Sequence, residues 1–447
     1  MKKKITRREF LQQASVATAG VIVGTSLLNH KSYGRILGAN DRIRLAYAGV
    51  NSRGSMLIES FSSVKDIDIL HVCDPEKVAL DKGMKMAAAK GFSPKATEDF
   101  RTVLDPAKID ALVVAAPDHW HTAAGVLAAR AGVNVYVEKP VSHNAAEGEY
   151  LIAAMNSHKV VVGVGSQRRS VPYFQQCIQM LQQGAIGDIY LAKGWYVNNR
   201  PASTFQKGAA IPEGLNWDLW QGPAPRVPYI GGVVHYDWHW TWRWGSAEAA
   251  NNGPHEMDLM LWATGAPFPG KVTALGGKYQ YQDSWECPDT VQMIWETPGL
   301  MIVWEGRSRN GARIENSPRG TWYYGTKGSA QLQDGFFNIY DPKGKLINAI
   351  KADGRNAGDD GTNTASPGKY MDNLHAQNFC DAVRGKAGLT VTPVEGHKAA
   401  LYLHTGNIAQ RTGRTLNLDP ANGHILGDKE AQALFGRTYE KGWEPKV

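Results

Sequence analysis

The sequence predicts an α/β protein with a doubly wound parallel sheet, followed by an α+β domain with an open, mostly antiparallel sheet. Apolar strands alternate with helical segments from about residue 43 to residue 164, which is typical of a parallel sheet covered by helices. A glycine-rich turn follows the first strand. Beyond about residue 170 this alternation stops, and segments of period two indicate antiparallel strands. A length of 447 residues also exceeds what one core usually holds, so two domains are expected.

The first 39 residues differ from the rest of the chain in charge. They contain seven basic residues and one acidic residue, a net charge of +6, while the whole chain carries +7. Almost all of the excess positive charge therefore lies in this leader. Because the rest of the chain is nearly neutral, we expect no nucleic-acid partner. The charged residues of the leader are Lys2, Lys3, Lys4, Arg7, Arg8, Glu9, Lys31 and Arg35.

The leader also has the pattern of an export signal. Thr6-Arg7-Arg8-Glu9-Phe10-Leu11 precedes a weakly apolar run from residue 14 to residue 28, which resembles a twin-arginine signal. This resemblance predicts a periplasmic protein; a plain basic tail is the alternative. The run is too short and too weakly apolar for a membrane span, so none is expected beyond a leader that stays uncleaved.

The turn Gly49-Val50-Asn51-Ser52-Arg53-Gly54 follows the first strand and precedes a helix expected from about Met56. It fits the pattern G-x-G-x-x-G, with Asn51 in place of the middle glycine. Such a turn lets a pyrophosphate approach the backbone at a helix N-terminus, and asparagine tolerates unusual φ angles. The pattern predicts a dinucleotide site with Gly49, Asn51, Ser52, Arg53 and Gly54 at the phosphates.

Asp74 ends the second strand, residues 67–73, and lies 20 residues after Gly54. An acid at this place binds the ribose hydroxyls of the adenosine and disfavours a 2′-phosphate. The sequence therefore favours NAD, with NADP as the alternative. Asp74 would also serve as an N-cap for the helix that starts near Pro75, and one residue can do both.

Further strands end in polar residues. Residues 109–116 lead to Pro117-Asp118-His119-Trp120-His121, and residues 135–137 lead to Glu138-Lys139-Pro140, where the proline must stop the strand. Ligands bind at the carboxyl edge of such sheets. We therefore expect these residues at the cofactor: Pro117, His119, His121, Glu138, Lys139 and, after the strand 159–164, Gln167.

Metal binding is a weaker interpretation of the histidines. His119 and His121 are separated by one residue, so their side chains would diverge, and we favour a helix start beside the cofactor. A metal site built from His235, His239 and His255 stays an alternative. The cysteines Cys73, Cys177, Cys287 and Cys380 form no Cys-x-x-Cys motif, and any disulfide pairing is open.

The second domain contains Gly253-Pro254-His255-Glu256-Met257-Asp258, which opens a helix running to Trp262. His255 and Asp258 are three residues apart and share one face of that helix. Antiparallel strands are expected at 273–281, 290–296, 301–307, 321–325 and 337–340. A loop is expected at 351–367, and terminal helices at 372–384 and 393–411.

The glycine turn, the Pro117–His121 segment, Glu138-Lys139-Pro140 and the His255 segment together resemble the glucose–fructose oxidoreductase / inositol dehydrogenase / rhizopine catabolism (Gfo/Idh/MocA) family, over residues 42–418. The resemblance implies a Rossmann domain, tightly held NAD or NADP, and chemistry on a sugar or cyclitol hydroxyl. After the leader at 1–39, we expect a Rossmann domain at 40–166, a substrate and oligomerisation domain at 167–420 with terminal helices within 372–411, and a tail at 421–447; the resemblance also implies a homo-oligomer.

By the same match, Lys139 is the catalytic lysine and His255 is the catalytic histidine. Members often have an aspartate four residues before that histidine, where this chain has Asn251, so proton transfer is expected to depend on His255. Asp258 is expected to orient His255 or to bind a substrate hydroxyl. A glycosidase of the same fold, which oxidises its sugar only transiently, is the alternative activity, and a sugar-binding protein without turnover is the alternative without catalysis.

Overall fold

The computed structural model describes residues 42–352 and 369–447. The predicted leader and almost all of the predicted loop 351–367 lie outside these ranges. Within them, no helix is both long enough and apolar enough to cross a membrane. Cys73, Cys177, Cys287 and Cys380 are all buried free thiols.

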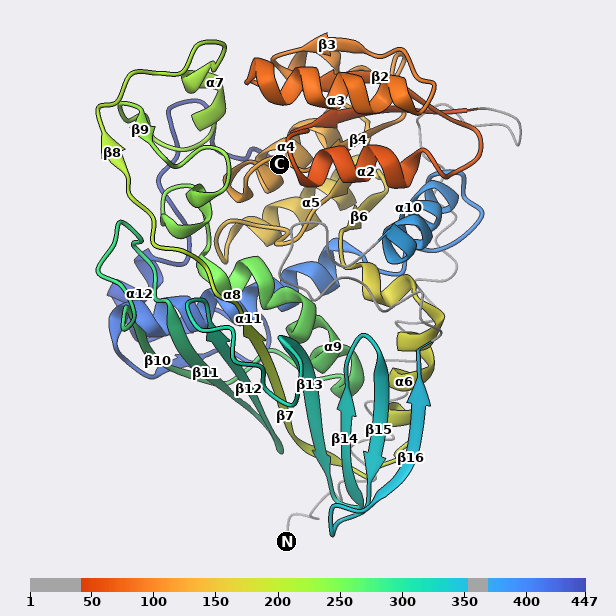
Figure 1. Cartoon of the computed structure of the whole chain (residues 1–447), viewed down its shortest axis with the longest axis vertical. Coiled ribbons are helices and arrows are strands. Elements are labelled where there is room, and N and C mark those ends of the chain that lie inside the picture. Colours follow the sequence, from red (N-terminus) through yellow and green to blue (C-terminus); the bar gives the residue numbers. More distant parts are fainter. Residues whose placement is uncertain (1–41, 353–368) are drawn as a thin grey trace, which may run out of the picture. The chain divides into compact units, whose positions relative to one another are not determined.

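The first sheet has six parallel strands, as the alternating pattern predicted, and it lies in the upper part of Figure 1. All four residues of its fourth strand are buried, because helices cover both faces. In spatial order the strands are β3 (Lys95–Thr97), β2 (Ile67–Cys73), β1 (Ile43–Ala48), β4 (Ala111–Val114), β5 (Asn134–Val137) and β6 (Val162–Val164).

The helices of this sheet begin at places set by the turns before them. The glycine turn leads directly into a helix at Arg53, three residues earlier than Met56. Pro117, with its fixed φ, is the N-cap of a helix that begins at Asp118, so His119 and His121 lie in its first turn. The connecting helices are α2 (Arg53–Phe61), α3 (Lys77–Ala89), η1 (Phe100–Val103), α4 (Asp118–Arg130) and α5 (Glu147–His158).

The second sheet has ten strands, and all of its neighbours pair antiparallel except β7 and β12, which are parallel. In spatial order they are β16 (Leu346–Lys351), β15 (Phe336–Tyr340), β14 (Gly328–Leu332), β13 (Arg319–Gly325), β7 (Ile189–Val197), β12 (Leu300–Arg307), β11 (Thr290–Thr297), β10 (Lys271–Gly277), β17 (Leu416–Leu418) and β18 (Ile425–Leu426).

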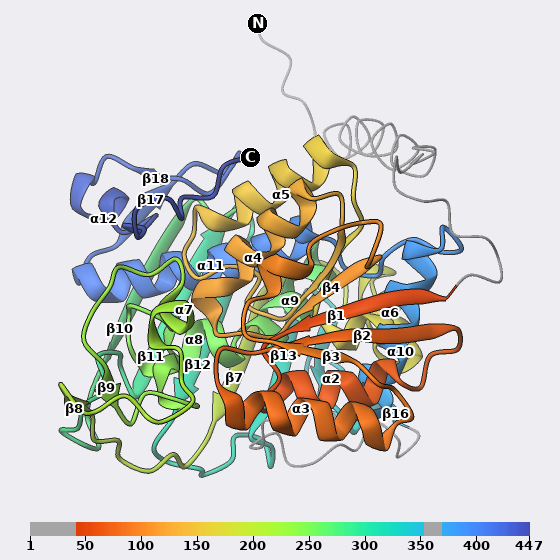
Figure 2. The ribbon, with the colours of Figure 1, turned by 90° about the horizontal axis from the view of Figure 1, so that it is seen from above.

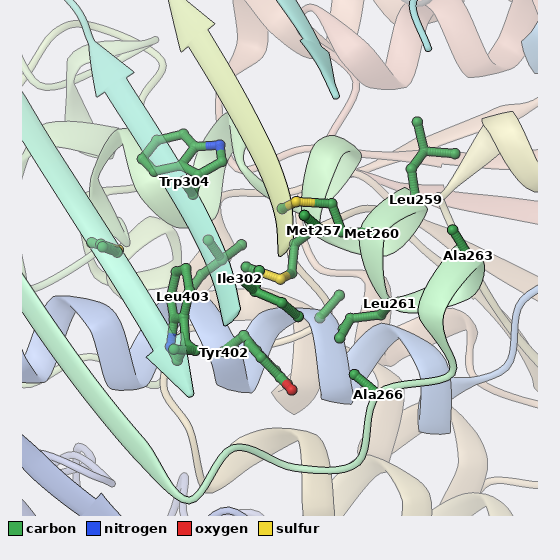
Figure 3. Close-up of a cluster of buried hydrophobic side chains, with 14 of the residues drawn as sticks. Met257, Leu259, Met260, Leu261, Ala263, Ala266, Ile302, Trp304, Tyr402 and Leu403 are labelled. Carbon is green, nitrogen blue, oxygen red and sulfur yellow. The ribbon is translucent and has the colours of Figure 1, made fainter. Parts of the chain in front are cut away.

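One face of this sheet packs against helices. Figure 3 shows Met257 and Met260 of one helix clustered with Ile302 and Trp304 of β12 and Leu403 of another helix. The helices of this half are η2 (Gln167–Ser170), α6 (Pro172–Gln182), α8 (Ala247–Asn252), α9 (Pro254–Thr264), α11 (Pro393–Thr412) and α12 (Lys429–Ala433). The long segment 199–245 adds β8 (Gln206–Lys207), α7 (Trp217–Gln221), β9 (Ile230–Gly231) and η3 (Asp237–Trp240).

Two late segments of the chain return to the first domain. The helix α10 (Lys369–Val383) contributes Phe379 to the Rossmann core, with ring centroids 6.1 Å from Phe61 and 5.6 Å from Tyr136. In the C-terminal tail, the ring of Trp443 lies 5.1 Å from that of Trp120 in α4. The division into residues 40–166 and 167–420 follows the order of the chain, whereas the packing joins α10 to the first half.

Candidate active site

The glycine turn has the geometry that a pyrophosphate needs. Gly49 has φ +84°, and a Cβ there would lie 2.5 Å from the backbone nitrogen of Ala116. A Cβ on Gly54 would lie 1.9 Å from the carbonyl oxygen of Gly49. Only glycine fits at either position, so the backbone and the first turn of α2 stay open to a phosphate group.

A pocket lies beside this turn, with walls from both halves of the chain. The Rossmann wall includes predicted cofactor residues: Gly49, Asn51, Ser52, Asp74 and Pro117. The opposite wall comes from the segment 199–245, and its residues are Leu219, Trp220, Val234, His235 and Trp238. Figure 2 shows that segment, with α7, β8 and β9, alongside the carboxyl ends of the Rossmann strands.

Asp74 stands at the pocket as predicted. Its Oδ2 accepts a hydrogen bond of 2.9 Å from the backbone N–H of Val50, and its Oδ1 accepts one of 3.1 Å from that of Glu76. Burial raises the pKa of Asp74 to about 6, although the two backbone donors oppose that shift. The carboxylate therefore links the glycine turn to the start of α3 and keeps lone pairs for ribose hydroxyls.

Arg53 is engaged in ion pairs. Its Nε donates to Glu138 at 2.8 Å, and its two terminal nitrogens donate to the carboxylate of Asp372 in α10 at 2.7 Å each. The guanidinium therefore joins α2 to the end of β5 and to α10. Its backbone N–H remains part of the predicted phosphate site.

Glu138 and Gln167 lie under the site. Glu138 is 3% exposed and accepts hydrogen bonds from Arg53, from the backbone N–H of Lys139 at 3.2 Å and from Gln167 at 3.2 Å. Burial would raise the pKa of this carboxyl, but Arg53 and Lys139 hold it below its ordinary value. Both residues belong to the hydrogen-bond network at the end of β5, and neither lines the pocket at the glycine turn.

His119 and His121 fasten backbone segments to one another. Nε2 of His119 lies 3.0 Å from the carbonyl oxygen of Trp220, and burial lowers the pKa of its ring to about 3. The ring of His121 lies between the carbonyl oxygens of Pro140, at 2.6 Å, and Ala116, at 2.8 Å. The predicted helix start is confirmed, but these rings point to backbone carbonyls and not into the pocket.

Lys139 crosses from the Rossmann sheet to the second domain. Its Nζ donates to the backbone carbonyl oxygen of Asn251 in α8 at 2.8 Å and lies 3.4 Å from that side chain's Oδ1. Burial lowers the pKa of the ammonium, while Glu138 and Asp118 oppose this shift. The lysine is thus held at the carboxyl edge of the sheet, beside the helix pair that carries His255.

His255 lies in the first turn of α9 and is 8% exposed. Its ring has no hydrogen-bond partner among residues 42–352 and 369–447. Burial, followed by the charges of Arg319, Arg168 and Lys139, holds the pKa of the ring well below its ordinary value. The imidazole is therefore neutral at pH 7 and has a nitrogen ready to accept a proton.

Asp258 shares the helix face of His255 but has a different partner. Both of its oxygens lie 2.9 Å from Nε of Arg169, and a terminal nitrogen of that guanidinium lies 2.8 Å from Oδ1. The expectation that this carboxylate orients His255 is corrected: it anchors α9 to η2, the segment after β6.

Two polar residues of the segment 199–245 approach Lys139: Tyr236, which the sequence analysis did not single out, and His239, which it named only for an alternative metal site. Tyr236 hydrogen-bonds the side chain of Asn251, and its carbonyl oxygen lies 2.6 Å from Nδ1 of His239. Lys139 is one of the charges that lower the pKa of His239, after burial. In the described ranges no group of three or more His, Cys, Asp or Glu is arranged to hold a metal ion.

Three family models match consecutive parts of the chain. The model described as an oxidoreductase family with an NAD-binding Rossmann fold matches residues 43–166. A GFO/IDH/MocA C-terminal domain matches residues 174–331, and an oxidoreductase C-terminal alpha/beta domain matches residues 327–445. Together they agree with the predicted fold and with NAD as the cofactor.

Solved structures share this fold at low identity. The WlbA dehydrogenase of Bordetella pertussis, solved with NADH and UDP-GlcNAcA, superimposes with a TM-score of 0.62 at 19% identity, covering 85% of this chain and 99% of its own. The scyllo-inositol dehydrogenase of Lactobacillus casei, solved with NAD(H) and scyllo-inositol, has a TM-score of 0.61 at 17% identity, covering 84% and 99%.

Curated relatives are similar over a shorter stretch. A glycosyl hydrolase family 109 protein of Solibacter usitatus is 32% identical over 147 residues, which are 31% of this chain and 34% of that protein. One of Shewanella baltica is 22% identical over 216 residues, 43% of this chain and 46% of that protein. The similarity thus spans from a third to a half of these relatives.

Proposed function

Because this chain belongs to the GFO/IDH/MocA oxidoreductase family, we propose that it transfers a hydride between a secondary hydroxyl of a sugar or cyclitol and NAD. The observation that carries the proposal is the placement of Lys139. Its ammonium is held at the carboxyl edge of the Rossmann sheet and reaches Asn251, four residues before the neutral His255. Two relatives of the same fold were solved with a sugar nucleotide or a cyclitol, which supports this substrate class.

The residues divide the work of the reaction between them. A bound nicotinamide would supply the hydride chemistry, and the protein supplies position and proton transfer. Lys139 donates a hydrogen bond to the reacting oxygen and stabilises the negative charge that develops there. His255 accepts the hydroxyl proton in the oxidation and returns it in the reduction. Asn251 has no basic group, and its carbonyl oxygen orients the lysine instead.

A glycosidase is the second candidate, favoured by the similarity to family 109 glycosyl hydrolases. In that reaction the sugar is oxidised only transiently. Its acidified C–H bond then permits elimination of the aglycone, followed by addition of water and reduction of the ketone. The same lysine and histidine would serve the oxidation step, so the site geometry is compatible with both reactions.

One experiment separates the two candidates. The purified full chain with NAD is incubated with a panel of free sugars, cyclitols and aryl glycosides, and both reduced nicotinamide and released aglycone are measured. A dehydrogenase reduces nicotinamide in proportion to oxidised sugar, and this proportion holds up to one equivalent per site when the dinucleotide stays bound. A glycosidase releases aglycone, but no reduced nicotinamide accumulates. Absence of both products with every compound would contradict the proposed function, whereas dinucleotide binding alone would favour a sugar-binding protein.

We also propose that the chain is exported to the periplasm and forms a homo-oligomer. The twin-arginine pattern at Arg7 and Arg8 supports export. The open face of the ten-stranded sheet exposes Leu275 and Met301, which supports association through that face. Light scattering on the purified chain tests the assembly, and a Leu275→Asp variant that lowers the mass would locate the interface.

A further inference from the structure

The segment of the second domain that forms the outer pocket wall is joined to the Rossmann domain by backbone hydrogen bonds. The N–H of Lys77 donates to the carbonyl oxygen of Gly214 at 2.9 Å, and the N–H of Asn216 donates to that of Pro75 at 2.9 Å. Leu215 and Glu76 form an antiparallel β-bridge between these contacts. All of these bonds meet the turn just after Asp74, which is the adenosine-ribose end of a Rossmann site.

Side chains add two further links. Nε2 of His235 lies 3.2 Å from Oε1 of Glu76, and both residues line the pocket. Nδ2 of Asn216 donates to Oε2 of Glu98 at 3.1 Å. The other carboxylate oxygen of Glu76 is buried and has no hydrogen-bond partner among the described residues. A buried carboxylate oxygen without a donor is costly, and a ribose hydroxyl in the pocket would supply one.

The outer wall is itself a packed unit. The rings of Trp217 and Trp220 stack with centroids 4.9 Å apart, and each lies 5.3 Å from the ring of Trp244. Tyr229 packs edge-on against Trp217 at 5.0 Å. Such a cluster moves as a whole, so opening the pocket requires the links to Pro75, Glu76, Lys77 and Glu98 to break together.

We propose that the segment Gly214–Trp238 is a latch across the adenosine end of the pocket, which keeps the dinucleotide bound from one turnover to the next. The inference depends on the proposed function for the identity of the ligand. Glu76 becomes a further dinucleotide-binding residue, and His235 becomes the residue that holds the latch shut.

Dinucleotide exchange tests the latch without any sugar. The full chain is loaded with isotope-labelled NAD and freed of excess, and loss of label into unlabelled NAD is followed in time. The variants are His235→Ala, which removes the contact with Glu76, and Asn216→Asp, which keeps the N-cap bond to Leu219 but sets a second carboxylate against Glu98. His158→Ala is the matched control, because His158 is an exposed histidine at the end of α5.

We expect each latch variant to release label about three- to tenfold faster than the parent chain, as fits the loss of one partly exposed polar contact, and the double variant faster still. The His158→Ala control should match the parent. Equal release rates in parent and latch variants would overturn the proposal, as would complete exchange by the parent within the mixing time. Retention of label without turnover of any sugar would contradict the proposed function and leave the latch standing.

Discussion

The ammonium of Lys139 lies 2.8 Å from the backbone carbonyl oxygen of Asn251, and this contact joins the edge of the Rossmann sheet to the helices that carry the histidine. A backbone carbonyl cannot take up a proton at neutral pH. The contact therefore positions the lysine without deprotonating it. Asn251 itself is neutral, at a position that often carries an acid in this family. Proton transfer then falls to His255.

Substitution of Lys139 or His255 should slow hydride transfer and leave NAD bound. Lys139→Ala removes stabilisation of the developing charge, a loss of about 10²-fold or more. His255→Ala removes the base, a loss of about 10²- to 10⁴-fold. Single-turnover reduction of bound NAD measures both. The double variant should be little slower than the slower single variant, because the two groups act on one oxygen; fully additive losses would place the base elsewhere, with His239 as the next candidate.

The pH dependence of the rate should follow the depressed pKa of His255. Because burial and four nearby cations favour the neutral ring, the base stays available well below pH 6.5, the ordinary value for histidine. The single-turnover rate should therefore be level from about pH 6 to pH 8 and fall only in more acidic solution. A rate that rises tenfold per pH unit across this interval would show that the base has an elevated pKa.

Discrimination between NAD and NADP should depend on Asp74 and on pH. With a pKa of about 6, the carboxyl is ionised at pH 8 and repels a 2′-phosphate, but it is mostly neutral at pH 5. The ratio of the dissociation constant for NADP to that for NAD, measured by fluorescence titration, should shrink about tenfold as the pH falls from 8 to 5. Asp74→Ser should show the smaller ratio at both pH values, and a parent ratio that does not change would rule out this carboxylate as the discriminating group.

Removal of the Arg53 side chain should lower the stability of the fold more than it weakens binding of the cofactor phosphates. Arg53→Ala leaves the carboxylates of Glu138 and Asp372, both nearly inaccessible, without their partner, which costs about 3–5 kcal/mol. The melting temperature should fall clearly. The exposed pair of Lys271 and Glu296 provides the control, since Lys271→Ala should change stability by less than about 1 kcal/mol.

Export should require Arg7 and Arg8 together. Replacing both by lysine keeps the charge but removes the paired guanidinium groups of the twin-arginine pattern. A folded, dinucleotide-loaded protein should then stay in the cytoplasm, as cell fractionation would show. Unchanged export of this double variant would mean that the leader works in another way.

The local patterns of the first domain could be predicted because each has a local cause. Buried strands in a parallel sheet are continuous apolar runs, and the turn at Gly49 and the stop at Pro140 follow from backbone sterics. Strands β14 and β16 were not predicted: β14 is built largely from small residues, and β16 is almost fully exposed and lacks an apolar alternation. Their formation is decided by strand pairing rather than by their own pattern.

The partners of charged side chains could not be predicted, since they come from distant parts of the chain. Arg53 meets a carboxylate 319 residues away, and Lys139 meets a carbonyl 112 residues away. Asp258 has a histidine on its own helix face, yet it binds Arg169 after β6. Helix spacing places a side chain on a face, but only the assembled fold decides which opposite charge that face meets.

The packing of α10 into the first domain sets a condition on the synthesis of the protein. Phe379 lies against Phe61 and Tyr136, so the dinucleotide-binding half lacks part of its interior until about residue 380 has left the ribosome. A nascent chain that ends after β6 would expose those rings to water. The half that begins the sequence therefore completes its folding late, after more than four-fifths of the chain has been translated.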